Sequence, residues 1–222
     1  MGLCSNPSSN IDIASVWGLP QPCHDRSVST LDALLVKVRA CGICSSDLPL
    51  GPRPIVQISR TARILVAGQA PGSKVHASGI AWDDPSGIRL REWMGIGTEV
   101  FYDPAQIALL PMGFCYPGSG PSGDLPPRRE CAPTWRAALL NELHELELTL
   151  VIGRYAQEYH LEEVGSSVTE TVKNWRRSWP NVIPLPHPSP RNNIWMKKNP
   201  WFAEELVPVL QQRVAAVLSS NS

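Results

Sequence analysis

The sequence has no excess of either charge sign, because its 20 Lys and Arg residues balance its 20 Asp and Glu residues. Zero net charge gives no bulk field directed at a polyanion, but a local basic groove can coexist with it, so nucleic acid stays open as a partner. The chain also lacks an apolar run of about twenty residues, and its start lacks the basic and apolar regions of a signal peptide. We therefore expect a cytoplasmic protein without a membrane segment.

The length and composition predict one globular domain. A chain of 222 residues with 43% hydrophobic residues can bury a sizeable core. Residues 1–28 are rich in Ser, Asn and Pro without sustained periodicity, and we expect them to form an irregular extension that carries Cys4 and Cys23 as free thiols. We expect residues 29–222 to form a single α/β domain and the protein to be a monomer.

Four further cysteines are arranged in two pairs. Cys41 and Cys44 form a C-x2-C element, whereas Cys115 and Cys131 are separated by fifteen residues. In a cytoplasmic chain, such cysteines are more often metal ligands, catalytic groups or buried thiols than disulfides. One C-x2-C element is a weak signal, but two paired elements indicate a four-thiolate site. A thioredoxin-like site fits poorly, because the C-x2-C element follows a predicted helix instead of starting one.

The hydrophobic pattern alternates between strands and helices. Short apolar runs typical of buried strands lie at 62–68, 106–112, 148–153 and 181–186. Helical spacing predicts a first helix capped by Ser29 or Thr30, and later helices at 86–94, 132–146, 154–161, 167–178 and 201–218. This alternation predicts an α/β fold, a three-layer α/β/α sandwich with a central, mainly parallel four-stranded sheet.

The loops that follow the predicted strands carry polar groups shaped by glycine and proline. In open parallel sheets the ligand site lies beyond the carboxyl ends of the strands. Those ends are followed by "GQAPG", "GFCYPG", "GRYA" and "PHPSP". Gly68, Pro71 and Gly72 force a tight turn, which is neither a Walker loop nor a dinucleotide fingerprint. Four prolines hold His187 and Ser189 on a stiff, non-helical segment.

An aromatic residue and two acidic residues precede one predicted helix. Trp82, Asp83 and Asp84 lie just before "PSG". The acidic pair is open to two interpretations. It can be a solvated helix N-terminus, which the helix dipole favours. Alternatively, it can place a carboxylate beside a stacking ring, where it would orient water or stabilise a cation.

Three of these segments together resemble a known family. "GQAPG", "SGIAWDDPSGIRLREWMG" and "HPSPRN" resemble, in order and spacing, the motifs of the uracil-DNA glycosylase superfamily. "HPSPRN" is similar to the second motif of the single-strand-selective branch, and the cysteine layout is similar to that of the iron–sulfur branches. The resemblance runs from about residue 38 to 218 and implies base-excision repair of DNA that contains a damaged base.

The resemblance implies catalytic roles for three residues. His187 matches the histidine that donates a hydrogen bond to the base oxygen on which charge develops. Asp84 is similar to the catalytic carboxylate of one iron–sulfur branch, with Asp83 as the residue that an alignment shifted by one position would choose. Other branches place an Asp or Asn in the first motif, where this chain has Ala70.

The resemblance also implies ligand contacts. Residues matched to contacts with the flipped base are Gly68, Gln69, Ala70 and Trp82, the last at the place of a stacking Phe. Residues expected at the DNA strand and its phosphates are Gly72, Ser189, Arg191 and Asn192. The thiols expected to hold a 4Fe–4S cluster, with zinc or no metal as the alternatives, are Cys41, Cys44, Cys115 and Cys131.

The chain departs from the family at the second strand. Family members usually carry an Asn there that reads the base edge, whereas this chain has "LLPMGFC", with Pro111 near that place.

The leading hypothesis is a monofunctional DNA glycosylase that hydrolyses the N-glycosidic bond of uracil or another deaminated base. One alternative is a catalytically inactive nucleic-acid-binding protein on the same fold, and a weaker one is a hydrolase of free nucleosides.

Overall fold

The structure, a computed structural model, describes residues 30–121 and 123–219. The predicted extension at 1–28 and the Ser29 cap lie outside these residues. At the centre is a four-stranded, all-parallel sheet in the order β2-β1-β5-β6. Each strand lies within one of the four predicted apolar runs: β1 is Ile64–Ala67, β2 is Ile107–Leu109, β5 is Leu148–Ile152 and β6 is Val182–Leu185.

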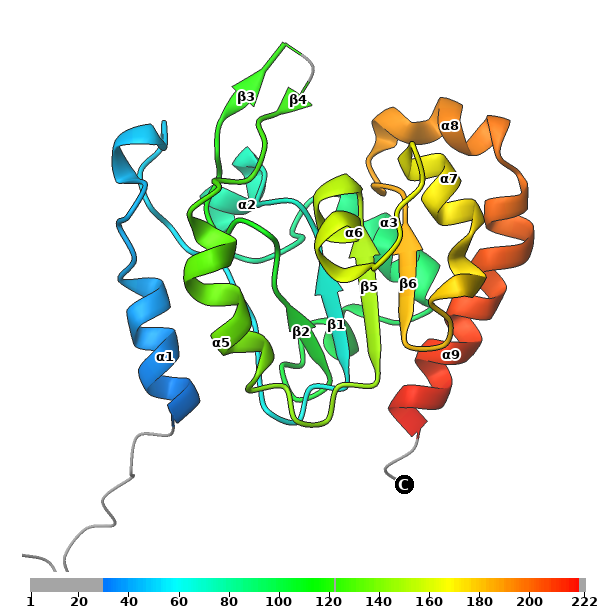
Figure 1. Cartoon of the computed structure of the whole chain (residues 1–222), viewed down its shortest axis with the longest axis horizontal. Helices are drawn as coiled ribbons and strands as arrows, with labels where there is room; N and C mark the ends of the chain where they lie inside the picture. The colour runs from blue at the N-terminus through cyan, green and yellow to red at the C-terminus, as the bar shows by residue number, and fades with distance from the viewer. Residues whose placement is uncertain (1–29, 122, 220–222) are drawn as a thin grey trace, which may run out of the picture.

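Helices cover both faces of this sheet, which confirms the predicted three-layer fold (Figure 1). Ile64 and Val66 of β1 pack in the core of one face, whereas Leu65 packs in the core of the other. The first face is covered by α3 (Pro85–Met94), α4 (Thr98–Phe101), α7 (Val168–Lys173) and α9 (Val207–Ser219). The second face is covered by α1 (Thr30–Arg39), α5 (Ala137–Leu140) and α6 (Arg154–His160).

Two predicted helices are shorter or less regular than expected. The segment predicted as a helix at 132–146 is a π-helix at Ala132–Arg136 followed by α5, which ends at Leu140. The helix predicted at 167–178 ends at Lys173 and continues as a 3-10 turn at Trp175–Arg177. The C-terminal helix also begins with a π-helical turn, at Phe202–Leu206. Apolar periodicity does not distinguish a π-helical from an α-helical turn, because both repeat at close to four residues.

Several short elements were not predicted. They are α4, α2 (Ser73–Ser78), α8 (Asn193–Lys198), the 3-10 turns Ser45–Asp47 and Pro190–Asn192, and the antiparallel hairpin of β3 (Ser119–Gly120) with β4 (Gly123–Asp124). The hairpin projects from the side of the molecule where the parallel strands end (Figure 1). Its sequence, "SGPSGD", has no apolar alternation and reads as a turn, so its strands carry no pattern that sequence reasoning can detect.

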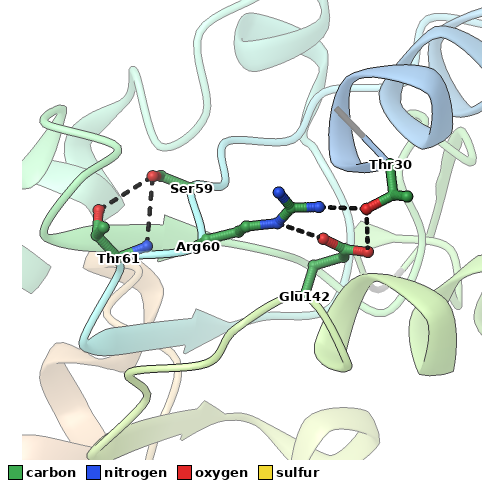
Figure 2. Close-up of polar contacts among 5 residues, drawn as sticks. All are labelled: Thr30, Ser59, Arg60, Thr61 and Glu142. Carbon is green, nitrogen blue, oxygen red and sulfur yellow. Dashed lines mark hydrogen bonds and ion pairs between the residues drawn. The ribbon is translucent and has the colours of Figure 1, made fainter. Parts of the chain in front are cut away.

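A polar cluster ties the start of α1 to the end of α5 (Figure 2). Arg60 donates to Glu142 through Nε at 2.7 Å and to the hydroxyl of Thr30 through Nη2. The same hydroxyl donates to Glu142 at 3.2 Å. This cluster fixes the position of α1, and α1 leads directly into the C-x2-C element. In the described part of the chain, no helix is long and apolar enough to cross a membrane.

Candidate active site and cysteine pocket

His187 is held in one orientation by its own loop. It follows β6, at the carboxyl edge of the sheet, as the sequence predicts. The backbone N–H of Ser189 donates to Nδ1 of His187 at 3.2 Å, so Nδ1 is an acceptor and Nε2 carries the proton of the neutral ring. Burial lowers the pKa of His187. The negative charges of Asp84 and Asp124 raise this pKa, but their effect is smaller than that of burial. At neutral pH the side chain is therefore a neutral N–H donor.

Three hydrogen bonds stiffen the loop around this histidine. The amide of Asn192 donates to the carbonyl of His187 at 2.7 Å, and Arg89 of α3 donates to the carbonyl of Ser189 at 3.0 Å. The hydroxyl of Ser189 accepts from the backbone N–H of Arg191 at 3.2 Å. Asn192 thus positions the loop, while the Ser189 hydroxyl keeps its own proton for an acceptor such as a phosphate oxygen.

Trp82 lies between the first motif and His187. A Cβ added to Gly68 would lie 2.9 Å from Cζ2 of Trp82, so the indole fills the space that any side chain at Gly68 would need. The centroids of the Trp82 and His187 rings are 6.1 Å apart, with their planes inclined by 31°. Trp82 also has a positive φ of 59°, which is strained for a bulky residue. Such a conformation persists only where the surrounding structure holds it, and here it brings the ring to the site.

Asp84 is the member of the acidic pair that acts on His187. It is the N-cap of α3, and its Oδ1 accepts from the backbone N–H of Gly87 at 2.8 Å. Gly87 is required there, because a Cβ would lie 1.8 Å from the carbonyl oxygen of Trp82. Burial raises the pKa of Tyr102, and Asp83 adds more to this rise than Asp84 does. Asp83 is exposed, whereas Asp84 is partly buried and is the one of the two whose charge acts on His187.

The β3–β4 hairpin brings a second carboxylate to the site. Oδ2 of Asp124 lies 3.3 Å from the position of a Cβ on Gly72. The hydroxyl of Ser119 donates to Oδ1 of Asp124 at 3.0 Å. Beside it, Nη1 of Arg191 lies 2.9 Å from the position of a Cβ on Gly123. The hairpin thus contacts both motif loops, and sequence reasoning missed Asp124 because its place depends on this fold-back.

The first motif fastens the hairpin as well. The side-chain amide of Gln69 donates to the carbonyl of Leu125 at 2.8 Å, so its nitrogen is used within the protein. Gly72, predicted at a phosphate, faces the carboxylate of Asp124 instead, and the like charges of that carboxylate and a phosphate would repel. Ala70 lies between Gln69 and Gly72 in the sequence and provides no polar side chain. The roles assigned to these residues at base and DNA stay predictions.

The chain after β2 lines the same site but carries no amide there. Backbone hydrogen bonds run from Met112 to Gly68 at 2.8 Å and from Gly113 to Gln69 at 2.9 Å. Pro111 therefore lies next to the first motif, as the sequence predicts. Its carbonyl accepts from the buried Arg136 at 2.9 Å. The Asn that usually reads a base edge in the family has no replacement in this segment.

The four predicted thiols line one pocket. Cys41 and Cys44 follow α1, Cys115 follows β2, and Cys131 precedes the π-helix. All four are free cysteines. In residues 30–121 and 123–219, no group of three or more His, Cys, Asp or Glu side chains is arranged to hold a single metal ion. The fold brings the four predicted cysteines to one pocket.

Burial and mutual repulsion oppose ionisation of Cys115 and Cys131. Burial raises the pKa of Cys115 to about 11, and the charges of Cys44 and Cys41 add to it. Burial also raises the pKa of Cys131 to about 12. A bound cation removes the protons, because metal ligation requires thiolates. Acidification should therefore weaken any metal or cluster held here.

Two N–H groups already point at the sulfur atoms. The indole N–H of Trp135 donates to Sγ of Cys41 at 3.3 Å, and the backbone N–H of Phe114 donates to Sγ of Cys131 at 3.4 Å. Hydrogen bonds of this kind stabilise thiolates and tune the metal that they bind. Sequence reasoning missed Trp135, although its place shortly after a predicted ligand was an available signal.

The fold and the site together define an α/β protein with a neutral histidine and two carboxylates at the carboxyl edge of its sheet. Residues 55–211, most of the chain, match the sequence profile of the Uracil DNA glycosylase superfamily, and the chain belongs to that superfamily. This membership supports a function of the DNA-glycosylase kind, with DNA as the partner. The chain is also similar to the solution structure of a candidate uracil DNA glycosylase from Methanosarcina acetivorans. The identity is 18%, the TM-score is 0.43, and the match covers 70% of this chain and 93% of the other.

Proposed function

We propose that the protein is a monofunctional DNA glycosylase of base-excision repair, which hydrolyses the N-glycosidic bond of a flipped uracil or another deaminated base. The observation that carries this proposal is the hydrogen bond from the Ser189 backbone to His187, which leaves Nε2–H of a neutral ring as a donor. A duplex base must leave the stack before it can reach such a pocket, at a cost of a few kcal/mol. Stacking on Trp82, roughly 1–3 kcal/mol per base, would offset this cost.

The reaction separates charge, and the site has groups of the right sign for both parts. When the bond between C1′ and the base nitrogen breaks, its electron pair leaves with the base and cationic character develops on the sugar. Nε2–H of His187 would stabilise the negative charge on the base oxygen, a contribution of about 3 kcal/mol by analogy with an oxyanion donor. The histidine donates a hydrogen bond and keeps its proton, because its pKa is lowered by burial.

The carboxylates act on the sugar side. Asp84 keeps one oxygen on the N–H of Gly87, so its second oxygen is available to the cationic sugar and to the attacking water. The water oxygen bonds to C1′, its lost proton passes to the carboxylate or to solvent, and the base leaves as the second product. No lyase step is proposed, since no positioned lysine is evident in the described site.

The cysteine pocket has the ligand set of a 4Fe–4S cluster, and zinc is the alternative. All four predicted cysteines line it. A 4Fe–4S cluster binds each of its four thiolates to a different iron. We propose that Cys41, Cys44, Cys115 and Cys131 hold this cluster.

When bound, the cluster would supply a covalent staple and a redox centre between the end of α1 and the loop after β2. The protein's own groups fit this role, because N–H donors from Trp135 and Phe114 already face two of the sulfur atoms. The loop after β2 also leads into the β3–β4 hairpin. A stapled loop would therefore hold Asp124 and its neighbours against the two motif loops.

One observation favours a second candidate function, a nucleic-acid-binding protein without catalysis. The segment after β2 offers no amide to the base edge, and Arg136 occupies the carbonyl of Pro111. Without that contact, the site would bind a base less selectively. A protein of this kind would bind DNA and release no base.

The test is base release from synthetic oligonucleotides. End-labelled single and double strands carrying uracil, hypoxanthine, xanthine or an oxidised pyrimidine are incubated with anaerobically purified protein. The proposal predicts free base and an intact abasic strand that breaks only after alkali. Binding without release would favour the second candidate. Release from free nucleosides alone would point to a nucleoside hydrolase instead.

A further inference from the structure

Arg136 is a charged side chain with no access to solvent. It is the last residue of the π-helix that begins directly after Cys131, and its exposed fraction is 0%. A charge is rarely buried unless an opposite charge pairs with it, because desolvation costs several kcal/mol per ion. Burial lowers the pKa of Arg136 only to about 10, so the guanidinium is cationic at neutral pH.

None of the groups around this guanidinium carries a negative charge. Nη1 donates to the carbonyls of Leu110 and Pro111, each at 2.9 Å, and Nη2 donates to Nε2 of His160 at 2.6 Å. Tyr159 lies under it, with 5.1 Å between Cζ and the ring centroid. Nε is buried without a hydrogen-bond partner, and no carboxylate in the described part of the chain forms an ion pair with Arg136.

The cysteine pocket is the candidate anion for this cation. The i to i+5 bonding of a π-helix places Arg136 about one turn from Cys131, on the same side of the helix. An ionised Cys131 lies close enough to act on the guanidinium, where its charge would raise the pKa of Arg136. Four thiolates outweigh the cationic core of an iron–sulfur cluster, so a loaded pocket is a net anion. The positive charge of Arg136 and the net negative charge of the loaded pocket would therefore balance each other.

A second arginine near the pocket provides a contrast. Arg128 lines the pocket, but its Nη2 is 2.9 Å from Asp47 and 2.9 Å from Glu130. Its charge is therefore already balanced, whereas that of Arg136 is not. Removal of Arg128 would leave the carboxylates of Asp47 and Glu130 without a partner beside the pocket, so Arg128 is unsuited as a control. Arg154 of α6 is exposed and does not line the pocket, and it serves as the control.

We propose that Arg136 is the buried counter-charge of the iron–sulfur cluster and raises the reduction potential of that cluster. The inference depends on the cluster proposed above. Reduction adds negative charge to a group that is already anionic, so a nearby buried cation stabilises the reduced form more than the oxidised form. Arg136 is a positioning and tuning residue in this account. It also holds the strand end at Leu110 and Pro111, which links the cofactor to the wall of the base site.

The experiment is a redox titration of anaerobically purified, iron-reconstituted protein, with the reduced cluster followed by electron paramagnetic resonance. Arg136→Gln keeps a donor for the carbonyls and removes the charge, Arg136→Lys keeps the charge, and Arg154→Gln is the control. A second neutral variant, Arg136→Met, has no side-chain amide, so a shift shared by Arg136→Gln and Arg136→Met is due to loss of the charge. Circular dichroism melting of each variant establishes that it is folded.

We expect the midpoint potential to fall in both neutral variants and to stay near the wild-type value in Arg136→Lys and Arg154→Gln. Loss of the cluster from folded Arg136→Gln, with retention in Arg136→Lys, supports the same conclusion. Unchanged potentials in both neutral variants, or an equal shift in Arg154→Gln, would overturn it. A wild-type protein that binds no cluster would overturn both the cofactor proposal and this inference. Base release is not a readout here, so an inactive protein with the expected potentials would contradict only the proposed reaction.

Discussion

The backbone N–H of Ser189 donates to Nδ1 of His187 at 3.2 Å, and this contact fixes which ring nitrogen carries the proton. The two residues are separated by one proline, and the amide of Asn192 closes the same loop by donating to the carbonyl of His187. The ring is therefore oriented by backbone geometry that does not depend on a substrate. Preorganised donors of this kind cost no reorganisation when charge develops.

Replacement of His187 should reduce the rate of the chemical step. Loss of one preorganised donor typically lowers the rate by about 10²–10³-fold, so we expect a loss of this size in His187→Ala with little change in DNA affinity. Single-turnover release kinetics and fluorescence anisotropy measure the two quantities separately. His144→Ala, at an exposed histidine outside the site, is the control and should keep the wild-type rate. Equal rates in the two variants would contradict the role of His187.

Asp84 has a structural and a chemical role that two substitutions separate. Asp84→Asn keeps a good N-cap for α3, whereas Asp84→Ala removes the cap at a cost of about 1 kcal/mol. We expect both variants to lose base release, but only the alanine variant to show a lower free energy of unfolding in urea. Asp83→Asn is the matched control and should retain activity. A normal release rate in Asp84→Asn would remove Asp84 from the reaction.

Asp124 should influence both His187 and the DNA. Its charge opposes the burial that lowers the pKa of His187, so Asp124→Asn should lower that pKa further. A titration of the His187 ring by nuclear magnetic resonance measures this shift without any need for activity. The lost carboxylate should also strengthen binding of single-stranded DNA, most clearly at low salt. Glu99→Gln, at an exposed residue of α4, is the control. An unchanged His187 pKa would place Asp124 outside the site.

The buried His160 should make stability depend on pH in a defined window. Burial and the neighbouring Arg136 lower the pKa of His160 to about 3, below its unfolded value near 6.5. Between these values the unfolded chain binds more protons than the folded one, so the free energy of unfolding falls as pH drops below about 6.5. His160 adds no such dependence above this pH.

His160→Gln should flatten this dependence. The wild-type loss attributable to His160 is roughly 1–3 kcal/mol by pH 4.5, measured as the difference between wild-type and variant in urea unfolding. Other groups with lowered pKa values act in the same direction, but they are common to both proteins and cancel in the difference. Parallel pH profiles for the two proteins would contradict the assignment.

The sheet and part of the site could be predicted from the sequence. Each strand is a continuous apolar run, because a parallel strand is buried on both faces. The carboxyl-edge rule then placed "GQAPG" and His187 near each other. The cysteine pairs were also predicted to converge, since their spacing on either side of β2 matched a four-thiolate site.

The remainder depended on tertiary contacts that leave no local pattern. Asp124 reaches the site only because a turn-rich hairpin folds back onto Gly72 and Arg191. Arg136 is a charged residue in a helical stretch, which sequence reasoning assigns to the surface, and a π-helical turn buries it instead. The sequence alone could not choose between Asp83 and Asp84. The structure favours Asp84, because it caps α3 and its charge acts on His187, and its role in the reaction stays a prediction.

The central claim is that the His187 and Asp84 pair hydrolyses the bond between a damaged base and its sugar. The most direct measurement is the amount of free base, quantified by liquid chromatography and mass spectrometry, released in a single turnover from a uracil-containing oligonucleotide and from its hypoxanthine and xanthine counterparts. The account predicts release from at least one of them by wild-type protein, with an abasic strand in equal amount, and a loss of at least about 10²-fold in both His187→Ala and Asp84→Asn. Tight DNA binding with no released base from any of the three, or equal release by the wild type and both variants, would contradict it.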